Sequence, residues 1–275
     1  MDGTVTNGPV ASRNPDELTD DAFLGGALQI LQPRAGYRAG LDAVMLAAAV
    51  PALNGQGTGA AAHCVLDVGA GVGTAGLCLA RRAPAAFVTL LEKEPQLVRI
   101  AQENVQRNEL VTRVSVVAGA VGVSAIEARG LGLGEESFAH VMANPPYHDA
   151  DAGTLAPDAL KAGAHAMVEG ELDGWARFMA RMAMPGGGMT IIHKVEALAR
   201  LLAALEGRFG ALKVLALHPR EGAAAHRVIV QGVKGSRGPL TLLPGFVLHA
   251  ADGQFTPAAQ DILRGGAALP LTAAS

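Results

Sequence analysis

The sequence is poor in cysteine, aromatic residues and charge, and these shortages narrow the classes of protein that it can encode. Its two cysteines, Cys64 and Cys78, fit neither a disulfide framework nor the regular spacing of a zinc site, so we expect both in the core. Aromatic residues make up 4% of the chain and charged residues 17%, against 50% hydrophobic residues and 35 glycines. This composition favours helices packed closely on a sheet over an aromatic-rich β-sandwich.

Long apolar runs are also missing. The first residues contain no apolar segment of the kind found in secretory signals. The longest apolar region, residues 43–62, is interrupted by Pro51, Asn54 and several glycines, which argues against a membrane span. We therefore expect a cytoplasmic protein with no membrane partner.

An excess of basic residues, the usual mark of a nucleic-acid binder, is absent because the formal net charge is -3. The charges are not spread evenly along the chain, since residues 213–237 contain five Lys or Arg residues and the single carboxylate Glu221. A local basic face and scattered charges around a hairpin are both compatible with this stretch. The histidine spacings match no ligand pattern, so we expect no metal.

The chain is expected to divide into a flexible polar tail over residues 1–21 and one domain over residues 22–275. Within the domain, short apolar strands alternate with helices. Strands are predicted at 63–68, 87–91, 114–118, 138–143 and 189–193, and helices at 41–53, 74–82, 94–108, 172–184 and 195–206. This alternation predicts an α/β fold with an open, doubly wound parallel sheet. Residues 212–217 and 227–234 lack a crossover helix between them and should pair antiparallel.

The first motif, Asp67-Val68-Gly69-Ala70-Gly71-Val72-Gly73, follows the first predicted strand of the parallel sheet. Glycines allow a tight turn into a helix and the close approach of a ligand. The pattern also fits the dinucleotide fingerprint, so NAD remains an alternative. Asp67 favours S-adenosylmethionine (SAM), because a carboxylate can reach the cationic amino-acid end of SAM and would repel a pyrophosphate. Glu92, at the end of the next strand, is placed to bind ribose hydroxyls in either case.

The second motif, Asn144-Pro145-Pro146-Tyr147, directly follows the fourth strand. An amino nitrogen conjugated to a π-system is a poor nucleophile. The Asn144 side-chain oxygen and the Pro145 carbonyl can accept its N–H bonds and orient it. The consecutive prolines stiffen the loop, and Tyr147 offers a flat face for stacking. The pair of motifs predicts a SAM-dependent N-methyltransferase.

With both motifs, the chain resembles the bacterial tRNA (adenine-N6)-methyltransferases that modify an adenine near the anticodon of a valine tRNA. The resemblance covers most of the chain beyond the tail and includes Gly25-Gly26, Gln32-Pro33-Arg34-x-Gly36-Tyr37-Arg38 and Leu41-Asp42-Ala43. It implies a Rossmann-like class I methyltransferase with a mostly parallel seven-stranded sheet and a C-terminal antiparallel hairpin. It also implies tRNA as partner and a segment around Tyr37 that closes over SAM and the acceptor. A homodimer is left open.

The motifs and the resemblance together assign the site residues. The acceptor site is assigned to Asn144, Pro145, Pro146 and Tyr147. SAM binding is assigned to Tyr37, Arg38, Asp42, Asp67, Gly69, Ala70, Gly71, Gly73, Glu92, Lys93, Ala120 and Asn144. Substrate contact is assigned to Arg34, Arg220, Arg227 and Lys234. Ala120 departs from the family, whose members usually carry an acid there that holds the SAM adenine amine.

Four other functions are compatible with parts of the sequence. A protein-glutamine methyltransferase needs the same Asn-Pro-Pro-Tyr chemistry, but such enzymes place a helical recognition domain ahead of the first motif, and 66 residues precede Asp67 here. A small-molecule methyltransferase remains open, although its usual catalytic His or Lys with metal-binding carboxylates is not recognisable. A non-catalytic SAM-binding module and a NAD-linked oxidoreductase complete the alternatives.

Overall fold

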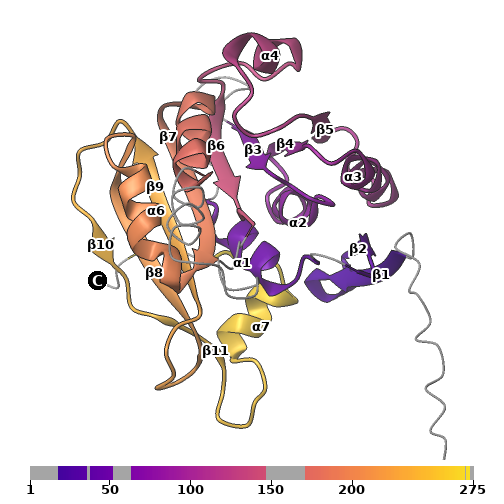
Figure 1. Cartoon of the computed structure of the whole chain (residues 1–275). Coiled ribbons are helices and arrows are strands. Elements are labelled where there is room, and N and C mark those ends of the chain that lie inside the picture. Colours follow the sequence, from indigo (N-terminus) through magenta and orange to yellow (C-terminus); the bar gives the residue numbers. More distant parts are fainter. Residues whose placement is uncertain (1–17, 36–37, 52–62, 147–170, 270, 273–275) are drawn as a thin grey trace, which may run out of the picture.

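The computed structural model describes residues 18–35, 38–51, 63–146, 171–269 and 271–272 (Figure 1). A central sheet carries helices on both faces, and a separate two-stranded hairpin lies beside it. The strands are β1 (Leu18–Phe23), β2 (Leu28–Pro33), β3 (Cys64–Val68), β4 (Phe87–Glu92), β5 (Val114–Ala118), β6 (Phe138–Ala143), β7 (Ala183–Lys194), β8 (Phe209–Arg220), β9 (Arg227–Lys234), β10 (Thr241–Leu242) and β11 (Phe246–His249). The α-helices are α1 (Leu41–Ala49), α2 (Thr74–Arg82), α3 (Pro95–Arg107), α4 (Ala125–Gly130), the helix over residues 171–182, α6 (Leu198–Leu205) and α7 (Pro257–Leu263).

The sheet has the order β10-β8-β9-β7-β6-β3-β4-β5, and β11 also pairs with β8. The strands from β3 to β7 are parallel, whereas β9 runs antiparallel between β7 and β8. The predicted doubly wound sheet and its terminal antiparallel pair are therefore confirmed. Two short strands, β10 and β11, extend the expected seven-stranded sheet at the outer edge of β8.

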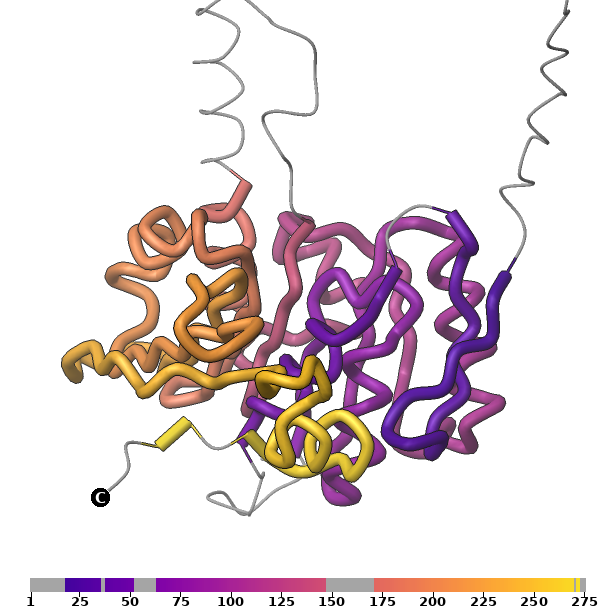
Figure 2. Tube along the Cα trace, turned by 90° about the horizontal axis from the view of Figure 1, so that it is seen from below, coloured from indigo at the N-terminus to yellow at the C-terminus, as the bar shows by residue number. Residues whose placement is uncertain are grey.

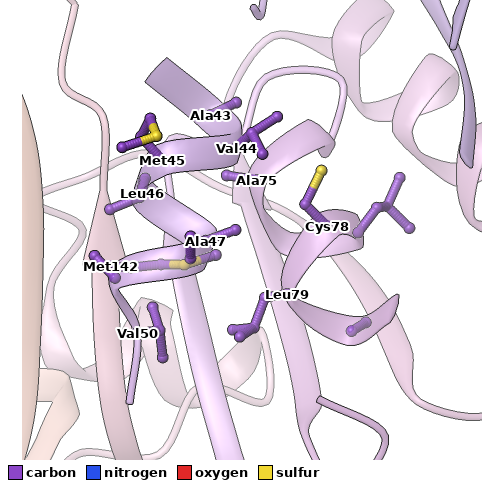
Figure 3. Packing of buried hydrophobic residues seen from close by; sticks show 14 of the residues in the cluster. Ala43, Val44, Met45, Leu46, Ala47, Val50, Ala75, Cys78, Leu79 and Met142 are labelled. Carbon is purple, nitrogen blue, oxygen red and sulfur yellow. The ribbon is translucent and has the colours of Figure 1, made fainter. Parts of the chain in front are cut away.

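Two hydrophobic clusters cover the two faces of the sheet. One contains side chains of α1, α2, α3 and α7, and the other contains side chains of α4, α6 and helix 171–182. Figure 3 shows α1 packed against Cys78 and Leu79 of α2 and against Met142 of β6. Cys78 is buried and Cys64 is half-buried, and neither forms a disulfide. Among the helices of the described ranges, none combines the length and apolarity that crossing a bilayer requires.

Three predicted boundaries were wrong for local reasons. The tail was drawn to Asp21, but Leu18 to Asp21 pair with β2, because the partner strand supplies their backbone hydrogen bonds. The helix predicted over 41–53 ends at Ala49, since Val50 precedes a proline and takes an extended ψ of 125°. The strand predicted over 189–193 begins earlier, because residues 183–188 also belong to β7 and pair with β6 through a register shift.

The β1–β2 hairpin is held to the domain by two buried asparagines, Asn104 of α3 and Asn108 directly after this helix. The Asn104 side chain accepts from the Leu31 N–H (2.8 Å) and donates to the Leu31 and Val72 carbonyls (both 3.0 Å). Asn108 makes the same pair of bonds to the backbone of Gln29, at 2.9 and 2.8 Å. The backbone N–H and C=O groups at the free edge of β2 are thus bonded by side chains and not by a further strand. Figure 2 shows the hairpin at the opposite end of the molecule from β8 and β9.

Replacing Asn104 with Ala should destabilise the protein by about 2–4 kcal/mol, because buried backbone groups of Leu31 and Val72 lose their partners. Urea denaturation measures this difference. Gln106→Ala, an exposed position on the same helix, serves as control and should change the stability by less than about 0.5 kcal/mol. Equal stabilities for the two variants would contradict the role given to Asn104.

Candidate functional site

The carboxyl ends of β3, β4 and β6 meet at one edge of the sheet. Val68, the last residue of β3, has Leu91 of β4 on one side and Ala143 of β6 on the other. The glycine-rich loop that starts at Gly69 therefore lies next to Asn144. Because β6 and β4 flank β3 on opposite sides, this edge is the switch point at which ligands bind in open α/β sheets.

The glycine-rich loop turns through left-handed conformations at Gly69, Gly71 and Gly73, with φ of 66°, 59° and 89°. The turn is closed by the Gly73 N–H, which donates to the Ala70 carbonyl at 2.9 Å. A Cβ on Gly71 would meet no atom within 4 Å, so the backbone there faces open space that a ligand can occupy.

Trp175 supports this loop from behind. A Cβ on Gly69 would collide with the indole ring of Trp175, which is buried with 8% of its surface exposed. Trp175 lies on the helix that the sequence predicts over residues 172–184. Its contact with the glycine-rich loop was missed, because the two are more than 100 positions apart and no spacing links them.

Glu92 closes the loop from β4. One of its carboxylate oxygens accepts from the Gly71 N–H at 2.8 Å, and the other accepts from the N–H groups of Lys93 (2.8 Å) and Glu94 (2.9 Å). The side chain is fixed by backbone donors and is buried, with 6% exposed. A carboxylate held in this way retains lone pairs for hydroxyl donors such as those of a ribose.

Asp67 lies beneath the loop, with 2% of its surface exposed. Its carboxylate accepts from the Gly76 N–H of α2 at 2.9 Å. Burial raises the pKa of Asp67 to about 7, the Gly76 N–H opposes this rise, and the charge of Glu92 adds to it. Two buried carboxylates held by N–H donors make this edge of the sheet favourable for a cationic ligand that also carries hydroxyl groups.

The Asn-Pro-Pro-Tyr motif, called the acceptor motif below after the role predicted for it, begins directly after β6. Asn144 is half-buried, Pro145 is buried and Pro146 is exposed, while Tyr147 lies outside the described residues. The register that sets Ala143 opposite Val68 brings Asn144 beside the start of the glycine-rich loop. The two predicted motifs are therefore adjacent in space.

The N-terminal segment is braced by Arg38 and reaches the same edge of the sheet through an ion pair of Asp42. The Arg38 guanidinium bonds Asp21 (2.6 Å), the Thr19 hydroxyl (2.7 Å) and the Pro33 carbonyl (3.1 Å), so it braces the hairpin. Asp42 of α1 forms an ion pair of 2.8 Å with Arg227 at the start of β9. Gly36 and Tyr37 lie outside the described residues.

The predicted basic residues divide between two edges of the sheet. Arg220 ends β8 and Arg227 begins β9 opposite Lys194, which places both at the edge that carries Asn144. Lys234 lies at the opposite edge, where its ammonium bonds Glu136 and the Ala183 carbonyl, both at 2.8 Å.

Three more predicted residues are at the surface or half-buried at the site edge. Arg34 is exposed just beyond β2. The side chain of Lys93 is 67% exposed and lies 3.8 Å from Glu94. Ala120 is half-buried in the loop after β5, so the described residues at that position offer backbone groups rather than an acid to a ligand.

His140, which invites a metal or acid-base interpretation, has a structural role. Its ring bonds the Thr190 hydroxyl at 2.8 Å, and burial lowers its pKa to about 3. Within the described ranges, no group of three His, Cys, Asp or Glu side chains is arranged to hold a metal ion.

A family model and a solved structure match the part of the chain that contains both motifs. Residues 46–173 match the model of the methyltransferase small domain. The crystal structure of protein Atu636 from Agrobacterium tumefaciens, described as a predicted O-methyltransferase, is 30% identical and superposes with a TM-score of 0.68 over 83% of this chain and 98% of that one.

Two kinds of curated relative are similar at comparable identity. The release factor glutamine methyltransferase of Caulobacter vibrioides is 30% identical, and the match covers 63% of this chain but 58% of the relative's length. The tRNA1(Val) (adenine(37)-N6)-methyltransferase of Aeromonas hydrophila is 27% identical, over 81% of this chain and 87% of the relative.

Asp67→Asn should remove a pH dependence of stability. Because the pKa of Asp67 rises from 3.8 to about 7 on folding, this carboxyl favours the folded state below pH 4, and that contribution is lost as the pH rises through about 7. The loss amounts to about 4 kcal/mol. The neutral Asn should avoid it and retain an oxygen for the Gly76 N–H.

Urea denaturation of both proteins from pH 4 to pH 8 measures the difference, and the stability of wild type relative to Asp67→Asn should fall across this range. A difference independent of pH would show that Asp67 is ionised throughout and would contradict its raised pKa.

Proposed function

Because the chain belongs to the SAM-dependent methyltransferases, we propose that it methylates a planar amino nitrogen and that the acceptor is the exocyclic amine of adenine in a tRNA. The observation that carries the proposal is the adjacency of Asn144 to the glycine-rich loop, fixed by the pairing of Ala143 with Val68. A donor bound at the loop and an amine held by the acceptor motif would then meet at one edge of the sheet.

The residues around the loop fit SAM. SAM supplies an activated methyl group on a sulfonium, so the transfer needs no metal. Glu92 would accept from the ribose hydroxyls, and the open backbone at Gly71 would lie against the ligand. The buried charge of Asp67 would favour the cationic amino-acid end, acting from beneath the loop. With Ala120 after β5, the adenine of SAM would be held by backbone groups or by another loop.

At the acceptor side, the Asn144 side-chain oxygen and the Pro145 carbonyl would each accept an N–H of the substrate amine. Both bonds orient the nitrogen lone pair toward the methyl group and raise its electron density as the new bond forms. The proton leaves after transfer, when the nitrogen is cationic and acidic. The burial of Pro145 keeps its carbonyl in place without an ordering cost on binding.

Two observations favour tRNA over a protein acceptor. The similarity to the tRNA enzyme of Aeromonas hydrophila extends over 81% of this chain and most of that relative, whereas the similarity to the glutamine methyltransferase covers 63%. In addition, Arg34, Arg220 and Arg227 lie on the N-terminal segment and at the edge that carries Asn144, where they would face RNA phosphates. A protein glutamine is the second candidate acceptor, supported by the 30% identity to the release factor glutamine methyltransferase.

Asn144→Ala should leave SAM affinity nearly unchanged and lower kcat by about 10²-fold or more, because it removes a contact that matters most as the nitrogen becomes cationic. Calorimetry with SAM and single-turnover methyl transfer measure the two quantities. Asn144→Asp retains an acceptor oxygen and should keep more activity than the alanine variant. Wild-type turnover in Asn144→Ala would refute the proposed acceptor site.

The acceptor class is tested by incubating the wild-type protein and radiolabelled SAM with separate pools of tRNA, ribosomal RNA, DNA and release factors. We expect label in tRNA and, after digestion, N6-methyladenosine by mass spectrometry. Label in a glutamine of the protein pool would replace tRNA by the second candidate, and label in no pool would contradict both.

A further inference from the structure

A pocket of about 470 Å³ opens at the outer end of the sheet, away from the glycine-rich loop. It is bounded by the end of β8, the turn into β9, the end of β11 and the loop after β11. Its lining residues are Pro219, Arg220, Ala223, His226, His249 and Gly253. One arginine and two histidines face it, and no carboxylate is among these lining residues.

The pocket has a rigid wall. His249 bonds the Pro219 carbonyl through Nδ1 at 2.9 Å, and its ring stacks on Phe255 with centroids 4.5 Å apart and planes at 25°. Since a carbonyl oxygen only accepts, Nδ1 is the donor in this bond. The ring is thereby fixed as part of the pocket wall, and in this tautomer its Nε2 is an acceptor.

Arg220, the cation of the pocket, differs from the two basic residues at the ends of β9. Arg227 is paired with Asp42 and Lys234 with Glu136. Arg220 and His226 are exposed, and within the described ranges neither side chain forms an ion pair with a carboxylate. A guanidinium without a carboxylate partner is suited to an anion with several acceptor oxygens, such as a phosphate, and the exposed imidazole of His226 can add an N–H donor.

The position of the pocket relates it to the acceptor site. Arg220 and His249 are register partners at the carboxyl ends of β8 and β11, on the same edge of the sheet as Asn144. From β6 the sheet passes through β7 and β9 to β8, which is about 15 Å at the usual strand spacing. A single RNA strand can span this distance with a few nucleotides.

We propose that the pocket binds a backbone phosphate of the acceptor RNA, a few nucleotides from the base that is methylated. This assignment of the anion to RNA rests on the proposed function. The phosphate contact sets the position of the strand on the protein, and the acceptor motif selects the base.

The test compares Arg220→Glu with Arg237→Glu, an identical charge change at an exposed position beyond β9, on the opposite edge of the sheet. Methyl transfer to tRNA is measured between 50 and about 300 mM salt. Arg220→Glu should raise KM for tRNA about tenfold and reduce the slope of log KM against log salt by about one. Arg237→Glu should change KM by less than about twofold. Equal effects of the two variants would overturn the proposal.

A second arm separates this proposal from the proposed function. If the wild-type protein methylates no RNA, the proposed function fails, and titration with inorganic phosphate then decides the pocket. Saturable shifts of the His226 and His249 imidazole NMR signals, lost in Arg220→Glu, would keep the phosphate site and assign it to a different phosphorylated ligand. Absence of these shifts in the wild type would overturn the site as well.

Discussion

The site depends on the register of β3 between its two parallel neighbours. Val68 is held opposite Leu91 and Ala143, and this pairing alone brings the glycine-rich loop, Glu92 and Asn144 to one edge. Both faces of β3 are buried under helices, so a slip of one residue would turn every side chain to the wrong face. Such a slip would disrupt the packing of several buried apolar side chains. The free energy of that packing therefore keeps the two motifs next to each other.

The same edge holds charge that the fold alone does not need. Asp67 and Glu92 are buried carboxylates that accept hydrogen bonds from backbone N–H groups. Burying them costs stability, as the raised pKa of Asp67 indicates. Under the proposed function, a cationic donor with ribose hydroxyls would offset that cost when bound. Reduced stability at a site that a ligand would complete is typical of functional positions.

The N-terminal hairpin is coupled to this edge through side chains. Asn104 bonds both β2 and the Val72 carbonyl of the glycine-rich loop, and Gln32 bonds the Ala39 backbone beyond the hairpin. Asp42 then pairs with Arg227 of β9. These contacts tie the chain before and after Tyr37 to the sheet. The residues on either side of this segment are therefore held in place. The family resemblance predicts that the segment itself lies over the ligand.

The sequence by itself determined the α/β alternation, the two motifs and their order, because hydrophobic periodicity and turn residues act over a few positions. It could not assign individual charges. Arg227 and Lys234 lie at the two ends of one predicted strand, and it is the antiparallel pairing of β9 with β7 that sets Arg227, and not Lys234, at the edge that carries Asn144. The contact of Trp175 with Gly69 and the pocket at Arg220 likewise arise from pairings between distant segments. Such contacts depend on tertiary packing, which leaves no local pattern to read.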